Sequence, residues 1–179
     1  MWGFERHEVV PDLVTLGKPM GNGFPIGAVV GRKAPMDLFG ATARYSNTFD
    51  GNAVGIAAAD AVLTILQRDR IPEHALAMGE RLRVGLEHLA KLHDGIGGIR
   101  NAGLFFGIDI GLDGTGEASR RAMALDIVNL MRDDGVLIST TGANEETLKV
   151  RPPLICQGEH VDRFLEAMEC ALKKAVAQV

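Results

Sequence analysis

The chain has few of the features that mark secreted, metal-binding or membrane proteins. Its two cysteines, Cys156 and Cys170, lack metal-ligand spacing, so we expect reduced thiols in a reducing compartment and no nucleophile at either position. The five histidines sit in polar surroundings without a ligand pattern, so we expect no metal. No apolar run approaches the roughly 20 residues that cross a bilayer, and the first residues do not read as a signal peptide. We therefore expect a cytoplasmic protein that binds neither a metal nor a membrane.

An excess of positive charge is also missing. The net charge is −4, and the basic residues are scattered rather than gathered into a stripe that could follow nucleic-acid phosphates. Hydrophobic residues make up 46% of the chain, which predicts a folded protein. A length of 179 residues suits one ordinary domain, or a piece of a larger enzyme plus one small complete domain. Nucleic-acid binding is disfavoured, and both domain organisations stay open.

The first part of the chain predicts strands and helices around a lysine. Residues 9–16 read as extended, and residues 26–31 read as a compact apolar strand of the kind buried in an α/β sheet, with Lys18 between them. A short helix is predicted over residues 34–39. An alanine-rich helix follows and ends near Arg70; its apolar residues at helical spacing are Val54, Ala58, Ala61, Val62, Ile65 and Leu66.

The rest of the chain predicts several strands and three helices. A helix ending near Gly95 carries one apolar face, formed by Ala75, Met78, Leu82, Leu86 and Leu89. Two strands joined by a turn follow from residue 96, then a helix over about 117–133 and strands over 136–139 and 148–151. A terminal helix carries an apolar stripe of Val161, Phe164, Leu165, Met168, Leu172, Ala175, Val176 and Val179.

This order of elements predicts two regions that meet around residues 67–73. The second region has enough strands and amphipathic helices to cover one face of a sheet, so we expect it to be self-sufficient. The first region has too few strands to cover both faces of a parallel sheet. We therefore expect the first region to be part of a larger domain.

The lysine segment is the best candidate for chemistry. In Leu16-Gly17-Lys18-Pro19-Met20-Gly21-Asn22-Gly23, a lysine follows a strand, among glycines that let a flat ligand approach the backbone. This arrangement suits an enzyme that forms a Schiff base through a neutral lysine amine. The alternative is a solvated loop lysine, the commonest fate of this residue type.

Three segments together resemble the class III aminotransferases in order and approximate spacing. They are the lysine segment, residues 46–52 (Ser-Asn-Thr-Phe-Asp-Gly-Asn) and residues 148–154 (Leu-Lys-Val-Arg-Pro-Pro-Leu), and the resemblance covers nearly the whole chain. The lysine segment is most similar to the alanine-glyoxylate type 2 and ethanolamine-phosphate phospho-lyase branch. The resemblance implies pyridoxal 5'-phosphate as cofactor and an α/β, aspartate-aminotransferase-like PLP-transferase fold (fold type I). Residues 1–70 would be the C-terminal part of an incomplete large, cofactor-binding domain, and residues 71–179 a complete C-terminal α+β small domain.

The resemblance also implies roles for residues of the first two segments. Lys18 would be the catalytic Schiff-base lysine that carries the cofactor and later shuttles protons between the substrate carbon and the cofactor. Thr48 would donate a hydrogen bond to the cofactor phosphate of the neighbouring subunit in a homodimer, and Asn47 or Ser46 would assist. A hydroxyl just before a helix suits an anion, although it can equally serve only to cap the helix.

The third segment departs from the family pattern. Most members have an arginine at the position of Lys149, where it forks onto the substrate carboxylate, and a lysine cannot make the same bidentate pair. Arg151 lies two residues on and would face the same side of an extended segment, so it is a candidate replacement. Both can also be solvated strand-edge charges. A lysine at this position is also found in the phospho-lyase branch, whose substrate carries a phosphate and no α-carboxylate.

The implied function is transfer of an amino group from an amine or amino acid to a keto acid. The alternatives are a phospho-lyase that acts on a phosphorylated amino alcohol, and a folded, dimerising fragment without activity. The family places its cofactor-phosphate loop, its ring-stacking aromatic residue and its pyridine-binding aspartate before the segment where this chain begins. We therefore expect this chain alone not to be an active transaminase.

Overall fold

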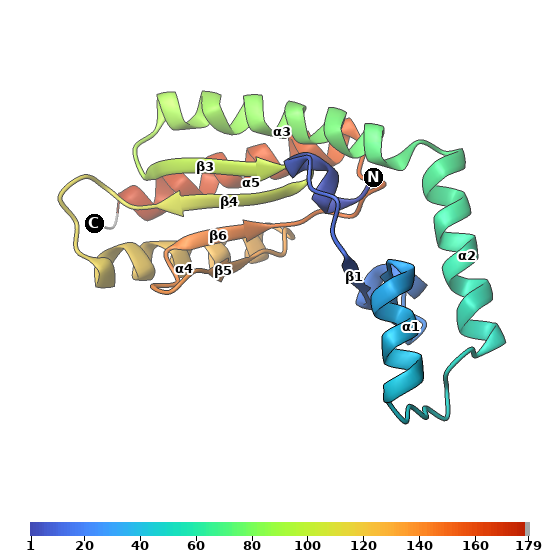
Figure 1. The fold of residues 1–179 in the computed structure, drawn as a ribbon. Helices are drawn as coiled ribbons and strands as arrows, with labels where there is room; N and C mark the ends of the chain where they lie inside the picture. The colour runs from blue at the N-terminus through green and yellow to red at the C-terminus, as the bar shows by residue number, and fades with distance from the viewer. Residues whose placement is uncertain (178–179) are drawn as a thin grey trace. The chain divides into compact units, whose positions relative to one another are not determined.

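The structure, a computed structural model, describes residues 1–177 of the chain (Figure 1). The chain divides into two compact units, Met1–Ile71 and Pro72–Val179. No helix in the described residues is long and apolar enough to cross a membrane.

The first unit consists of a two-stranded sheet, two α-helices and two short 3-10 helices. Strand β1 pairs antiparallel with β2, with Leu16 opposite Ala28. The elements are η1 (Gly3–His7), β1 (Leu13–Leu16), η2 (Lys18–Gly21), β2 (Ala28–Gly31), α1 (Lys33–Thr42) and α2 (Ala53–Arg68).

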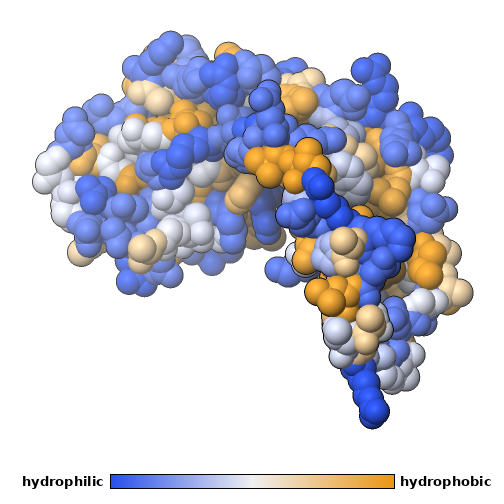
Figure 2. Space-filling model, viewed as in Figure 1, coloured by the Kyte–Doolittle hydropathy of each residue, from blue (hydrophilic) through white to orange (hydrophobic). Residues whose placement is uncertain are grey.

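Very little of the first unit is buried. The only buried residues in it are Gly21, Gly55 and Ala59. Val29 and Val30 are each 56% exposed, so the expectation that residues 26–31 form a buried strand is wrong. The physical reason is that a two-stranded sheet has no further strands or layers to cover its faces. Apolar residues consequently lie at the surface of the part that carries β1 and α1 (Figure 2).

Helix α2 packs through its smallest residues. A Cβ added at Gly55 would lie 3.1 Å from Cε1 of Phe24, closer than an ordinary van der Waals contact, so a side chain there would require the Phe24 ring to shift. The expected apolar stripe of this helix is therefore partly wrong, because Val54 is 63% and Ile65 is 45% exposed. Gly55 and Ala59 are buried at the contact, while Val54 and Ile65 face outward.

The second unit is a four-stranded sheet with three helices. All neighbouring strands pair antiparallel in the order β3-β4-β6-β5. The elements are α3 (Ile71–Leu92), β3 (Ile96–Ala102), β4 (Phe105–Ile110), α4 (Glu117–Asp133), β5 (Ser139–Thr141), β6 (Thr147–Val150) and α5 (Gly158–Val176). The two outer strands differ from the inner ones: β5 has three residues, and β3 shifts register against β4 between Ile96 and Gly98.

One hydrophobic core holds this unit together. Helices α4 and α5 lie behind the sheet in Figure 1, and residues of α3, α4 and α5 join one cluster with the inner face of the sheet. The sheet contributes Phe106, Ile108, Ile110, Leu148 and Val150, all at most 3% exposed. The predicted apolar faces of α3 and α5 are confirmed, with Val179 outside the described residues.

Two strand predictions in this unit need correction. Residues 136–138 are not a strand, because the amide of Val136 donates to the carbonyl of Met131 at 2.8 Å and so continues the exit from α4. The strand begins only at Ser139. The next strand is Thr147–Val150, so Arg151 lies one residue beyond it, before Pro152. A proline has no N–H to offer to a ladder, which limits the strand at this end.

Helix α3 and the β3–β4 turn approach each other closely. Gly103 in the turn has a φ of +56°, a left-handed conformation that suits glycine. A Cβ added at Gly79 of α3 would lie 2.4 Å from the carbonyl oxygen of Gly103. The contact therefore depends on Gly79 having no side chain.

Candidate functional site

Lys18 lies in a tight turn directly after β1. Its φ is +47°, and it opens the short helix η2, in which the amide of Asn22 donates to the carbonyl of Pro19 at 3.0 Å. The left-handed conformation costs a non-glycine residue about 1–2 kcal/mol. Strained residues of this kind cluster at functional sites, so the conformation of Lys18 agrees with a functional role for this turn.

The turn is anchored while the Lys18 amine is left uncommitted. Gly21 at the end of η2 is buried, and a Cβ added there would lie 2.8 Å from Cγ2 of Ile26. Lys18 itself is exposed and has no hydrogen-bond or ion-pair partner within residues 1–177. Lys33, by contrast, donates to Asp37 at 2.5 Å. The arrangement leaves the amine of Lys18 available to a ligand.

Asn47 and Thr48 lie in the turn before α2 and play different parts. The side-chain oxygen of Asn47 accepts from the amide of Phe49 at 3.0 Å, so it shapes the turn. Thr48 is exposed, and its hydroxyl makes no hydrogen bond within the described part of the chain. The residue that caps α2 is Asn52, which accepts from the amide of Gly55 at 2.9 Å. The alternative in which Thr48 caps the helix is therefore wrong.

No hydrogen bond or ion pair in residues 1–177 joins Lys18 to Asn47 or Thr48. The implied role of Thr48 at a neighbouring subunit does not require such a bond.

Lys149 and Arg151 lie on the outer face of the four-stranded sheet. Leu148 and Val150, on either side of Lys149, are 0% and 3% exposed and enter the core, so Lys149 points to the opposite face. The guanidinium carbon of Arg151 lies 5.6 Å from the centre of the Phe105 ring, which is itself largely exposed. The structure therefore brings these two cations to one side of the sheet.

A hydrogen-bonded network that the sequence analysis missed lies on the same face. Arg100 donates to both carboxylate oxygens of Asp109, at 2.7 Å for Nη2 to Oδ1, and the Thr147 hydroxyl donates to Oδ1 at 2.6 Å. The hydrogen bonds from Arg100 hold the pKa of Asp109 below its ordinary value, assisted by Thr147 and opposed by partial burial. The alternation of apolar and polar residues in each strand indicates that Arg100 and Asp109 point away from the core. Which of the polar residues meet depends on the register of the β3–β4 hairpin, which that alternation does not specify.

A second contact that the sequence analysis missed fixes the loop after Arg151. His74 Nε2 donates to the carbonyl of Cys156 at 2.7 Å, which requires the proton on that nitrogen. Cys156 is buried, and burial raises the pKa of its thiol. The loop between β6 and α5 is thus tied to the start of α3.

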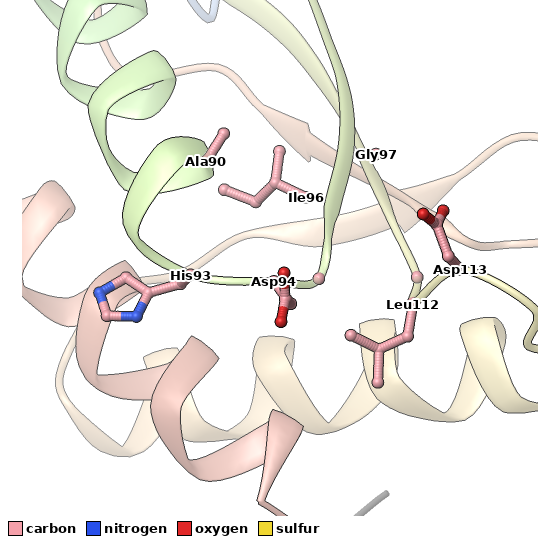
Figure 3. Close-up of a pocket in the computed structure, with 9 residues that line it drawn as sticks. Ala90, His93, Asp94, Ile96, Gly97, Leu112 and Asp113 are labelled. Atoms are coloured by element: carbon pink, nitrogen blue, oxygen red, sulfur yellow. The ribbon is translucent and has the colours of Figure 1, made fainter.

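A hollow of about 360 Å³ lies at the other end of α3 and is not lined by any of the predicted site residues. In the view of Figure 3, Asp94 lies between His93 and Asp113, and the three side chains do not point at one centre. His93 Nε2 instead donates to Glu169 at 3.1 Å. Within residues 1–177 there is no group of three or more His, Cys, Asp or Glu side chains that could hold a metal ion.

Comparison with known proteins gives a consistent picture. The family model for class-III aminotransferases matches residues 1–172. An ethanolamine-phosphate phospho-lyase homolog 1 from Caenorhabditis elegans is 39% identical over 174 residues, 96% of this chain and 37% of the relative. An alanine–glyoxylate aminotransferase 2 homolog 2, named mitochondrial, from Arabidopsis thaliana is 37% identical, over 97% of this chain and 36% of the relative. The chain spans little more than a third of the length of these curated relatives.

Solved structures agree on the fold. A phospholyase from Arthrobacter in complex with phosphoethanolamine has a TM-score of 0.90 and 42% identity, over 97% of this chain and 41% of that one. An S-selective transaminase from Arthrobacter sp. with alanine bound has a TM-score of 0.84 and 25% identity, over 99% of this chain and 41% of that one.

Proposed function

The chain belongs to the class-III aminotransferase family, and we propose that it supplies the cofactor-bonding lysine of an enzyme that transfers an amino group from an amine or amino acid to a keto acid. Enzymes of this family depend on pyridoxal 5'-phosphate, and their fold is the aspartate-aminotransferase-like fold type I. The observation that carries the proposal is the uncommitted Lys18 amine on an anchored, left-handed turn.

The residues present fit this cofactor by the chemistry of their donor groups. When bound, pyridoxal phosphate supplies a ring that draws electrons away from the substrate carbon. Lys18 would condense with its aldehyde with loss of water, and the amine, once released, would carry a proton from the substrate carbon to the cofactor. The free hydroxyl of Thr48 would donate to the phosphate of a partner subunit's cofactor, while Asn47 holds the turn that carries it.

Lys149 and Arg151 would bind the anionic group of the substrate. Both are cations on the outer face of the sheet, and neither has a carboxylate partner within residues 1–177. The Phe105 ring beneath the guanidinium would limit the orientations that Arg151 samples.

Reductive trapping tests the role of Lys18 without requiring turnover. The chain is incubated with pyridoxal phosphate, reduced with borohydride, digested and analysed by mass spectrometry. We expect the cofactor mass on the peptide that contains Lys18, and none there in Lys18→Ala. Lys33→Ala is the matched control, because Lys33 is engaged with Asp37. Labelling spread over exposed lysines, with no preference for Lys18, would contradict the proposal.

A phospho-lyase acting on a phosphorylated amino alcohol is the second candidate. Two observations favour it: Lys149 replaces the arginine that suits a carboxylate, and phospho-lyases are among the similar proteins. NMR titration of the chain distinguishes the two candidates. Phosphoethanolamine should shift the side-chain signals of Lys149 and Arg151 at lower concentration than alanine does. Equal or weaker effects of phosphoethanolamine would favour the transaminase.

We also propose a homodimer, because Thr48 is assigned to a partner's site and the first unit leaves much apolar surface exposed. A folded, dimerising chain without activity remains the alternative to both enzymes. Sedimentation at several concentrations tests the assembly, and a monomer throughout would contradict it. A cytoplasmic location stays a prediction, and one relative is named mitochondrial.

A further inference from the structure

We propose that Arg100 is a positioning residue that occupies Asp109 and thereby keeps Lys149 free to bind an oxyanion on the outer face of the sheet. This inference rests on the proposed role of Lys149 and Arg151 in binding the anionic group of the substrate. It adds a role for the network formed by Arg100, Asp109 and Thr147, hereafter the Asp109 network.

The strand register places Arg100 and Lys149 on either side of a glycine. Gly107 of β4 lies opposite Arg100 of β3 on one side and opposite Lys149 of β6 on the other. Neighbouring strands lie about 5 Å apart, so the two Cα atoms are separated by about 10 Å. A Cβ added at Gly107 would find Thr147 Cγ2 at 3.4 Å and Arg100 Nη2 at 3.7 Å. No side chain of β4 therefore fills the surface between the two cations.

Asp109 is the residue that could pair with Lys149 on this surface and so block an anion from binding. It is the only acidic residue in the four strands of the sheet. It lies opposite Thr147 and thus diagonal to Lys149. Diagonal neighbours in an antiparallel pair are about 7–8 Å apart, which a lysine side chain can span. A free Asp109 carboxylate would accordingly attract the Lys149 ammonium.

The Asp109 network prevents that pairing. Arg100 binds both carboxylate oxygens of Asp109, and Thr147 donates a third hydrogen bond. A bidentate guanidinium pair is stronger and more directional than a pair with a lysine ammonium. In agreement, Lys149 has no ion-pair partner within residues 1–177. The negative charge of the face is neutralised, and the positive charges of Lys149 and Arg151 remain.

Phosphate binding to the full chain tests this inference. Inorganic phosphate is titrated at constant ionic strength, and the side-chain signals of Lys149 are followed by NMR. We expect Arg100→Gln to weaken phosphate binding about fivefold, as the released Asp109 captures Lys149. The double variant Arg100→Gln with Asp109→Asn should recover wild-type affinity, because no acid is left to compete. Circular dichroism verifies the fold of each variant.

Arg81→Gln is the matched control, because Arg81 makes a similar bidentate pair with Asp162, with Nη2 at 2.8 Å and 2.7 Å from the two oxygens, but on the helices. It should leave phosphate affinity unchanged. The inference is overturned if wild type does not bind phosphate through Lys149, if Arg100→Gln binds as well as wild type, or if the double variant stays weak. Reductive trapping at Lys18 reports on the proposed function independently, so the failure of one does not imply the failure of the other.

Discussion

At the scale of single residues, the outer face of the sheet shows how one carboxylate can be held ionised. Asp109 accepts hydrogen bonds from Arg100 and Thr147, and the guanidinium is the larger cause of its lowered pKa. The Arg100 side chain is 63% exposed, so water and salt screen much of the attraction. The pair therefore adds modestly to the free energy of unfolding. Its main effect is that Asp109 pairs with Arg100 and not with another cation.

The pH dependence of this pair follows from the sign of the pKa shift. The folded pKa of Asp109 lies below the unfolded value of about 3.9, so the stabilisation is present above that pH and is lost as the pH falls through the folded value. We expect Asp109→Asn to lower the free energy of unfolding by at most about 1 kcal/mol at pH 7. Urea denaturation at pH 7 and at successively lower pH measures the effect, and a difference that does not shrink as Asp109 becomes protonated would contradict it.

The two cysteines should differ in reactivity. Cys156 is buried, with a thiol pKa raised by burial, whereas Cys170 is exposed. The thiolate is the form that reacts, so iodoacetamide should modify Cys170 well before Cys156 in the folded chain. Peptide mass spectrometry over a time course measures the two rates, with Cys170→Ser as the control. Equal rates in folded protein would show that the loop opens freely.

Residue-scale predictions from sequence succeeded where a side chain's direction depends on simple alternation. The expectation that Lys149 and Arg151 face the same side of an extended segment agrees with their positions on the outer face of the sheet. The pairing of Arg100 with Asp109 could not be predicted, because the two residues are nine positions apart and meet only through one hairpin register. The capping of α2 by Asn52 rather than Thr48 depends on where the helix begins, which the pattern leaves open by several residues.

At the scale of elements, α3 packs closely against the β3–β4 turn at Gly79. The carbonyl of Gly103 occupies the space that a side chain at this position would need. Backbone atoms cannot rotate away as a flexible side chain can, so the contact tolerates no addition.

Substitution of Gly79 tests this contact. Alanine has a better helix propensity, by up to about 1 kcal/mol, but the clash with the turn should outweigh it and lower stability by about 2 kcal/mol. Gly40→Ala is the control, because a Cβ added at that position of α1 has nothing within 4 Å. Urea denaturation of both variants measures the difference. A Gly79→Ala variant as stable as wild type would contradict a close contact between the helix and the turn.

Element type was predictable from periodicity, and boundaries were less so. The apolar faces of α3 and α5 repeat at helical spacing over many residues and were found correctly. The strand expected over residues 136–139 was wrong at residues 136–138, because the same apolar residues also suit the exit of a helix through Gly135, whose φ is +80°. A short apolar run does not distinguish these structures.

At the scale of the whole chain, the two units differ in how much of their surface is buried. The second unit has a core of large apolar side chains, while the buried residues of the first are glycines and an alanine. The sequence predicted a self-sufficient second region, and the number of strands explained why the first region cannot cover its own sheet. The pattern of apolar residues does not identify what packs against the exposed apolar side chains of the first unit.

Hydrogen exchange should separate the two units. Backbone amides of residues 1–71 have little burial to protect them, so we expect them to exchange at least about 100-fold faster than the inner strands β4 and β6. Mass spectrometry of peptides after timed exchange measures this. Similar protection in both units would indicate that the first unit is covered in solution, and sedimentation of the same sample would show whether a second copy covers it.

The two outer strands of the sheet bear on how the second unit behaves in concentrated solution. A long, regular edge offers unpaired backbone groups to another molecule and invites fibre growth. Here β5 is only three residues long, and the irregular register at the start of β3 disrupts the opposite edge. Neither edge is a good template for strand addition, so crowding should produce crystals or amorphous precipitate of this unit more readily than ordered fibrils.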